Sequence, residues 1–232
     1  MTMPTISGHR RQRTREQDPE RFAAAARAYG AAGWPCVPGS PAGSDRACSC
    51  DRMGCPSPGA HPLSAGWARQ ASVDADVIDA LWARRPDANV ILPTGRVFDV
   101  FDVPAAAGAL ALARIDAEGL PAGPVAAVAD ERYLFFVATR GAPVDEDEWW
   151  SCGLDCSPET VAETPGLRWH CRDSYVVAPP SQLPYGRAVT WLREPNGRGL
   201  PDPLRLLAVL SESCDPPLTD PASLLAGEPP TH

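Results

Sequence analysis

The sequence predicts an α+β domain in which a mixed β-sheet is flanked by helices and interrupted by a cysteine-rich loop. Three observations support this fold class. Amphipathic segments alternate with short apolar runs, a strand–helix–strand step follows Val103, and hairpin-like strand pairs come later in the chain. A chain of 232 residues is long enough for one substantial core. We therefore expect one main domain over residues 18–213.

The charge balance limits the partners that the protein can have. The 29 acidic residues outnumber the 21 basic ones and give a net charge of −8. A nucleic-acid footprint over the whole surface is therefore disfavoured, and any contact with DNA or a nucleotide should be a local patch. No apolar run approaches the roughly 18 residues of a membrane-spanning helix, so we expect a cytoplasmic protein without membrane contact.

The two ends of the chain have compositions that predict little structure. Residues 1–17 contain the string HRRQRTR and almost no apolar side chain, so this basic arm is expected to be disordered. It could contact DNA or RNA, although a solvated tail has the same composition. Residues 214–232 are rich in proline and are expected to form a flexible tail.

The first predicted helix begins directly after the basic arm. Asp18 is placed to cap this helix, Pro19 occupies its first position, and Gly30 and Gly33 mark its end. The run WPCVPG, residues 34–39, predicts a short strand. Residues 40–66 are rich in proline, glycine, serine and cysteine and show no periodicity. We therefore expect this loop to need a cross-link to keep a defined shape.

The loop at residues 40–66, here called the Cys/His loop, carries the strongest chemical signal in the sequence. Its candidate metal ligands are Cys48, Cys50, Cys55 and His61. Three thiolates and one imidazole suit a closed tetrahedral Zn²⁺ site, which would be structural and would contribute folding energy to the loop. Cys36 or Asp51 could replace one ligand, and the alternative is a set of free cysteines.

A second helix and a strand follow the loop. Residues 72–85 predict a helix that Pro86 ends, and residues 88–95, ANVILPTG, predict a strand and a turn. Five apolar residues are expected to form one buried stripe of the helix: Val73, Val77, Ile78, Leu81 and Trp82.

The central strand is predicted at residues 97–103, VFDVFDV. Because side chains alternate along a strand, Asp99 and Asp102 should point to opposite faces. Asp102 could be a metal ligand or could cap the next helix, and Asp99 is expected to face solvent or to accept a hydrogen bond. The next helix is predicted over Ala105–Glu118, with Leu110, Leu112 and Ile115 packed on the sheet.

The later part of the chain predicts mainly strands. Residues 123–129 and 132–138 form a predicted hairpin, and the acidic, Trp-containing run at 143–159 has no regular period. Two more strands are predicted at 174–181 and 187–192, and a final short helix at 201–212.

Six strings occur in the order in which one protein family carries them. They are YGAAGWPCVPG, the Cys-rich run ending PGAHP, ASVDADVIDALWARRPDANVILPTG, FDVFDVPAAAG, RYLFFV and YVVAPPS, within about residues 22–193. With these strings the chain resembles the bifunctional DNA primase/polymerase N-terminal (prim-pol) domains of the archaeo-eukaryotic primase superfamily. In particular, it resembles the compact actinobacterial members that consist of little beyond this domain.

The resemblance implies nucleotidyl transfer by two divalent ions, Mg²⁺ or Mn²⁺, held by three acids, with a histidine on the incoming triphosphate. Asp102 stands at the first acid, and Pro104 stands where its partner is expected. Tyr133, next to Arg132, stands in for the histidine, and Arg168 lies where the third acid is expected. These departures predict an eroded catalytic site in which Tyr133, Arg132 and Arg168 contact a nucleotide.

The resemblance and the departures together predict a zinc-bound, prim-pol-like protein. Its eroded site would be retained to bind nucleic acid, a nucleotide or a protein partner in DNA replication-related processes. One alternative is an active DNA primase/polymerase that recruits acids from Asp99, Asp130, Glu131 or Asp173. Another is a structural protein-interaction module that uses the acidic run within residues 143–159.

Overall fold

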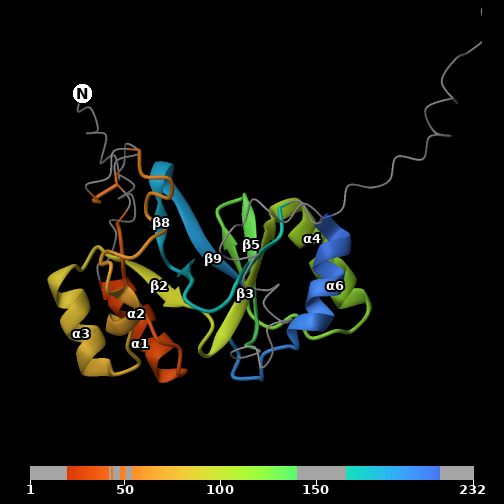
Figure 1. The fold of residues 1–232 in the computed structure, drawn as a ribbon, viewed down its shortest axis with the longest axis horizontal. Coiled ribbons are helices and arrows are strands. Elements are labelled where there is room, and N and C mark those ends of the chain that lie inside the picture. Colours follow the sequence, from red (N-terminus) through yellow and green to blue (C-terminus); the bar gives the residue numbers. More distant parts are fainter. Residues whose placement is uncertain (1–19, 42, 44–47, 51–53, 140–165, 215–232) are drawn as a thin grey trace, which may run out of the picture.

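Two antiparallel β-sheets lie between two groups of helices (Figure 1). The computed structural model describes residues 20–41, 43, 48–50, 54–139 and 166–214. The predicted basic arm, the acidic run at 143–159 and the tail beyond Cys214 lie outside these described residues, as do Asp18 and Pro19. The α+β class predicted from the sequence is confirmed. None of the helices in the described ranges is both long and apolar enough to cross a lipid bilayer.

The first group of helices contains α1 (Glu20–Ala31), the short α2 (Trp67–Gln70) and α3 (Ala75–Arg84). The N-terminus of α3 is capped by Asp74, whose carboxylate accepts the backbone N–H of Val77 at 3.0 Å. Ile78 and Trp82 are buried as predicted, but Val73 and Val77 are 48% and 44% exposed. The predicted stripe is therefore too wide, and sequence periodicity alone did not predict α2.

The smaller sheet is built around β2, in the order β1 (Val37–Gly39), β2 (Asn89–Pro93) and β7 (Tyr175–Ala178). All five residues of β2 are buried, so this strand has no exposed face and reads in the sequence as a continuous apolar run. One side of the sheet packs on α1 and α3 in the first core. The other side faces the Cys/His loop, where Val37, Ile91 and Val177 share a small cluster with Ala60.

The larger sheet has six strands, and all its described strand pairs are antiparallel. Their order is β6 (Arg168–His170), β3 (Phe98–Pro104), β5 (Arg132–Ala138), β4 (Val125–Val128), β9 (Arg187–Arg193) and β8 (Gln182–Leu183). The predicted strand–helix–strand step exists as β3, α4 (Ala105–Ala117) and β4. Because β5 inserts between β3 and β4, these two strands never pair with each other, and the predicted hairpin of β4 and β5 supplies the antiparallel neighbour.

The second core lies between the larger sheet and the helices α4 and α6 (Pro203–Cys214), seen on the right of Figure 1. Small residues let α4 approach the sheet closely, and a Cβ added at Gly108 would lie 2.5 Å from the ring of Tyr133. Ile115 is buried in this core as predicted. Leu110, in contrast, is 65% exposed, so the prediction that it packs on the sheet is wrong.

The turn between β2 and β3 holds the connection between β6 and β7 in place. Thr94 donates its hydroxyl to the carbonyl of Cys171 at 2.6 Å and its backbone N–H to Ser174 at 2.9 Å. Gly95 has a φ of 79°, and a Cβ at this position would lie 2.2 Å from the Cα of Arg172. The turn therefore requires glycine for two reasons, its left-handed backbone and the space that Arg172 occupies.

We predict that Gly95→Ala destabilises the protein by about 3 kcal/mol or more, because left-handed strain of about 1–2 kcal/mol adds to a backbone clash. Gly197→Ala is the matched control, since Gly197 has a φ of 73° but no heavy atom within 4 Å of an added Cβ. Gly197→Ala should therefore lower the free energy of unfolding only by the left-handed strain of about 1–2 kcal/mol. Urea unfolding followed by circular dichroism measures both values, and equal losses for the two variants would show that the contact with Arg172 is unimportant.

Candidate functional site

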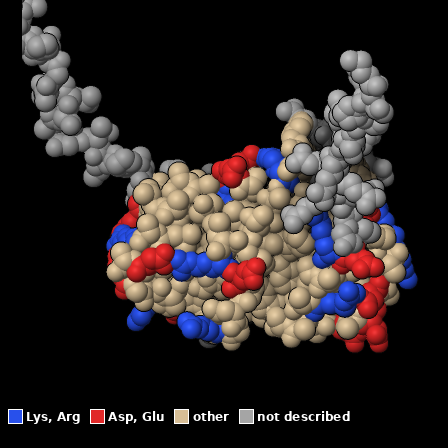
Figure 2. Space-filling view, turned by 180° about the vertical axis from the view of Figure 1, so that it is seen from behind, with Lys and Arg blue, Asp and Glu red and all other residues tan. Residues whose placement is uncertain are grey.

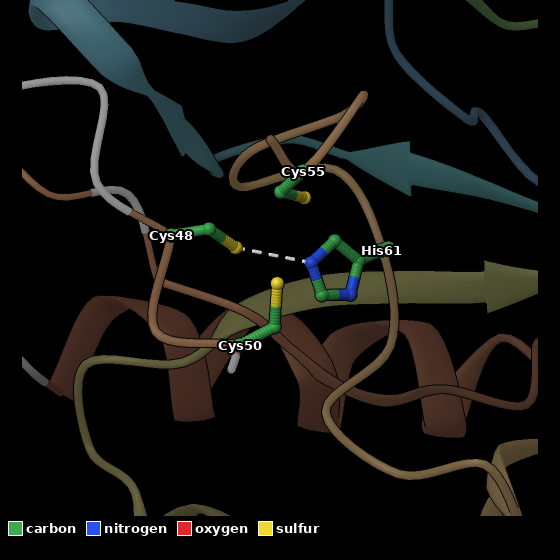
Figure 3. A group of neighbouring side chains, drawn as sticks. All are labelled: Cys48, Cys50, Cys55 and His61. Atoms are coloured by element: carbon green, nitrogen blue, oxygen red, sulfur yellow. Dashed lines mark hydrogen bonds between the residues drawn. The ribbon is translucent and has the colours of Figure 1, made fainter. Parts of the chain in front are cut away.

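The Cys/His loop brings its four predicted ligands to one point. One ligand atom each from Cys48, Cys50, Cys55 and His61 lies within 4.8 Å of all the others. Their side chains converge on a common centre in Figure 3. A tetrahedral ion with Zn–S and Zn–N bonds of about 2.0–2.3 Å requires ligand atoms roughly 3.5–4 Å apart, which small side-chain adjustments can reach here. The cluster could therefore hold a metal ion.

Contacts around the cluster favour metal binding. The N–H at Nδ1 of His61 donates to the carbonyl of Pro62 at 2.8 Å, which leaves Nε2 free to bind an ion. Nε2 lies 3.1 Å from Sγ of Cys48, and that sulfur is also 3.0 Å from Oγ of Ser40. Such contacts orient the ligands before the ion binds.

The thiols of the cluster differ in acidity. Burial opposes ionisation of Cys48, but hydrogen bonds from Ser40 and from the backbone N–H of Cys50 lower its pKa to about 6. Burial raises the pKa of Cys55 to about 11, with the neighbouring thiols of Cys50 and Cys48 adding to the effect. One thiolate is thus available at neutral pH, and a bound cation would draw the remaining protons off.

The alternative ligands are not in the cluster as the structure describes it. Cys36 is buried under α1, where its thiol donates to the carbonyl of Ala26 at 3.5 Å, and burial raises its pKa to about 12. The suggestion that it replaces a ligand is therefore wrong. Asp51, the other alternative, lies outside the described residues.

A second site lies beside this cluster, where a pocket of about 350 Å³ is bounded by the larger sheet, β7 and the Cys/His loop. Asp102, Arg132, Arg168 and His170 come from the sheet, while Ser57 and Ala60 come from the loop. The sequence predicted the first three as site residues on separate segments, and the structure brings them together. We call this cavity the Asp102 pocket.

Asp102 is held by Arg132 from the neighbouring strand. The carboxylate is 5% exposed, and its Oδ1 accepts a hydrogen bond from Nε of Arg132. The same guanidinium donates through Nη2 to the backbone carbonyl of Asp102 at 2.9 Å and to that of Gly166 at 2.5 Å. Such a charge-assisted set fixes the carboxylate in one orientation.

The other carboxylate oxygen of Asp102 faces two more nitrogen groups. Nη1 of Arg168 lies 3.6 Å and Nε2 of His170 lies 3.4 Å from Oδ2. Arg168 sits directly opposite Asp102 in the sheet register, so both side chains are on one face. Two guanidinium groups against one carboxylate leave the pocket with net positive charge, which suits an anion.

The fourth predicted site residue, Tyr133, lies on the opposite face of the sheet. It is paired with Val103, one residue beyond Asp102, and its ring packs against Gly108 of α4. Asp99 is on that face too and is buried, so the expectation that it faces solvent is wrong. The capping role considered for Asp102 is also wrong, because α4 begins after Pro104 without a side-chain cap.

The other acids proposed for an active enzyme lie away from the Asp102 pocket. Glu131 pairs with Arg187 at the surface, and Asp130 lines a different cavity, beyond the end of β4. Asp173 lies in the exposed turn after β6, with a φ of 63°. Among the residues that the structure describes, Asp102 is the only carboxylate that lines its pocket.

Two polar residues of this pocket, His170 and Ser174, were not predicted to lie beside Asp102. Nδ1 of His170 lies 3.1 Å from Oγ of Ser174, so the hydroxyl is held toward the imidazole. The sequence signal that could have identified His170 is its spacing of two residues from Arg168, which places both side chains on one face of a strand. Because β6 has only three residues, its run RWH was too short to be recognised as a strand.

A comparison with known protein families found one match. The family model for Prim-Pol, described as bifunctional DNA primase/polymerase, N-terminal, matches residues 26–207. The match includes the Cys/His loop and every described strand that lines the Asp102 pocket. A search of curated proteins returned no significant match.

We predict that Cys48→Ser and His61→Ala each lower zinc affinity by more than about 100-fold, since losing even a supporting contact costs about 10- to 100-fold. Competition with a coloured chelator measures the affinity, and elemental analysis gives the metal content. Cys214→Ser is the control, because Cys214 lies at the end of α6, outside the cluster. Wild-type protein that holds well under one equivalent of zinc with its thiols reduced would contradict the metal site.

Proposed function

The chain belongs to the bifunctional DNA primase/polymerase N-terminal family, and we propose that its Asp102 pocket binds a phosphate-bearing ligand without a two-metal polymerase centre. The ligand class is a nucleotide or the backbone of a nucleic acid. One observation carries the proposal: the carboxylate of Asp102 is paired with Arg132 and faces Arg168 and His170. A nucleic-acid-binding role of this kind would belong to DNA replication-related processes.

The pairing of Asp102 argues against two-metal chemistry at this position. Nucleotidyl transfer of that kind needs carboxylates that converge on two ions about 3.5–4 Å apart. Arg132 already occupies one oxygen of Asp102, and Pro104, two residues later on the same face, has no ligand atom in its side chain. A divalent cation would also meet the positive charge of Arg132 and Arg168.

The same charges favour a phosphate. Arginine presents N–H groups in a fork that matches phosphate oxygens, and the side chain of Arg168 is 44% exposed, so it can reach a ligand. Apolar side chains from Leu134 and Val176 line the rest of the cavity and suit a sugar or a base.

A local pocket also agrees with the acidic character of the whole protein. A net charge of −8 opposes a broad contact with nucleic acid. On the face shown in Figure 2, basic and acidic side chains lie in short mixed groups that uncharged areas separate. This face therefore offers no continuous basic track, whereas the described lining of the Asp102 pocket contains two arginines and one carboxylate.

We infer that the ion of the Cys/His loop is Zn²⁺ with a structural role. A set of three cysteines and one histidine, as the described residues form it, is typical of closed zinc sites. The ion would supply cross-linking of the loop. Other residues of the chain orient the ligands: Ser40 contacts Cys48, and the carbonyl of Pro62 accepts a hydrogen bond from His61.

We predict that Asp102→Asn tightens the binding of a nucleoside triphosphate by about fivefold at low salt, or ~1 kcal/mol, because it removes the only carboxylate charge described in the pocket. Fluorescence anisotropy with a labelled triphosphate measures the change. A template-directed extension assay with Mg²⁺ or Mn²⁺ gives the opposing test. Robust extension by the wild type that Asp102→Asn abolishes would refute the proposal in favour of an active primase/polymerase.

Arg168→Ala should weaken binding of a short single-stranded DNA by about tenfold and lower the slope of log affinity against log salt concentration by about one, as loss of one phosphate contact does. The matched control is Arg205→Ala, an exposed arginine on α6, behind the opposite face of the sheet. A salt slope that is identical for wild type and Arg168→Ala would mean that DNA binds elsewhere.

A further inference from the structure

We propose that Asn89 is a positioning residue that joins the Cys/His loop to the sheets, so that metal bound in the loop sets the affinity of the Asp102 pocket for its anion. The inference rests on the proposed function of that pocket. Its basis is a set of hydrogen bonds that connects one buried amide to both walls of the cavity.

Asn89, at the start of β2, is buried, and its side-chain amide has no spare capacity. Its Nδ2 donates to the carbonyls of Ser40 at 3.1 Å, Gly59 at 2.7 Å and Gln182 at 2.7 Å. Its Oδ1 accepts the backbone N–H of Gln182 at 2.9 Å. Two amide hydrogens are therefore shared among three carbonyls, and an ionised carboxylate could not replace them because it has no hydrogen to donate.

Two of these bonds lead to the metal ligands. Ser40 contacts the sulfur of Cys48 through its hydroxyl at 3.0 Å and donates its backbone N–H to the carbonyl of His61 at 2.8 Å. Gly59 precedes His61 by two residues. Asn89 thus holds the two residues between which the three cysteine ligands lie.

The same bonds lead to the Asp102 pocket. Ser57 and Ala60, which flank Gly59, form the loop wall of the cavity. Tyr175, which also lines the cavity, belongs to β7, and β7 pairs with β2 from Val90 to Pro93. Gln182 lies in β8, directly after the turn that follows β7. Asn89 is therefore bonded to the loop wall and, through β2 and β8, to the wall formed by β7.

Metal binding fixes the loop wall, because an ion held by four side chains removes the freedom of the chain between them. Without the ion, only hydrogen-bond contacts such as those of Cys48 with Ser40 and His61 hold the ligands together, so the carbonyls of Ser40 and Gly59 can move away from Asn89 more easily. Ser57 and Ala60 then leave the cavity, which opens toward water and weakens the attraction between Arg168 and an anion. Affinity for the anion should therefore follow the metal content.

Asn89→Asp tests the positioning role, with Asn196→Asp as the matched control. An aspartate at 89 would face three carbonyl oxygens without a hydrogen to donate. Asn196 is exposed, and its side chain only accepts the N–H of Arg198, which aspartate can also do. We expect Asn89→Asp to lower zinc affinity by about 10- to 100-fold and affinity for a labelled single-stranded DNA by about tenfold. Asn196→Asp should change neither value.

Removing zinc from the wild type with a chelator tests the coupling without changing the sequence. Affinity for the same DNA should fall about tenfold and return when Zn²⁺ is added. Amide hydrogen exchange should rise in the loop and in β7, while β3 and β5 stay protected and serve as the internal reference. Because this experiment uses the wild-type protein, it tests the coupling even if Asn89→Asp does not fold.

The possible outcomes separate the two proposals. If zinc-loaded protein binds no DNA at low salt, the proposed function fails, but the exchange of β7 still decides the role of Asn89. An increase in exchange that is confined to the loop would overturn the coupling, as would loss of protection throughout β3 and β5. Equal DNA affinity with and without zinc in folded protein would overturn it too.

Discussion

The pairing of the buried carboxylate of Asp102 with Arg132 is the interaction on which the site depends. A carboxylate that is 5% exposed on a central strand is costly unless a cation and hydrogen bonds compensate for lost water. Arg132 supplies both, and it also bonds the backbone of Asp102 and of Gly166. One guanidinium therefore fixes the charge of the pocket and ties β3 and β5 to the chain that leads into β6.

This pairing makes Asp102 different from a strand-end carboxylate in a two-metal centre. In a two-metal centre the carboxylate oxygens must be available to cations, whereas here a guanidinium holds one and Arg168 and His170 face the other. A cation and an arginine cannot share the same oxygen at low cost. This arrangement supports our proposal that the Asp102 pocket receives an anion.

The second structural constraint is the attachment of the Cys/His loop. A loop without regular structure keeps a defined shape only if cross-links replace the missing backbone ladder. The buried amide of Asn89 supplies hydrogen bonds of this kind, and a metal ion held by the four convergent ligands would add a further cross-link. Because Ser57 and Ala60 of this loop also line the Asp102 pocket, its order and the shape of the pocket have the same physical origin.

The sequence by itself determined the features that depend on local pattern. Alternation and helical periodicity predicted the α+β class, the hairpin of β4 and β5 and the helix α6, and close spacing within one loop predicted the cluster around Cys48. Family strings predicted the Prim-Pol match. Over such short stretches, chain geometry alone decides which side chains can meet.

Only the tertiary structure decided the features that depend on pairing between distant segments. Asp102 meets Arg132 across 30 residues and His170 across 68, and strand register alone sets both contacts. Register also places Tyr133 on the face of the sheet that α4 covers. The insertion of β5 between β3 and β4 makes the larger sheet antiparallel. Since a shift of one residue turns a side chain to the opposite face, no local pattern could place these groups.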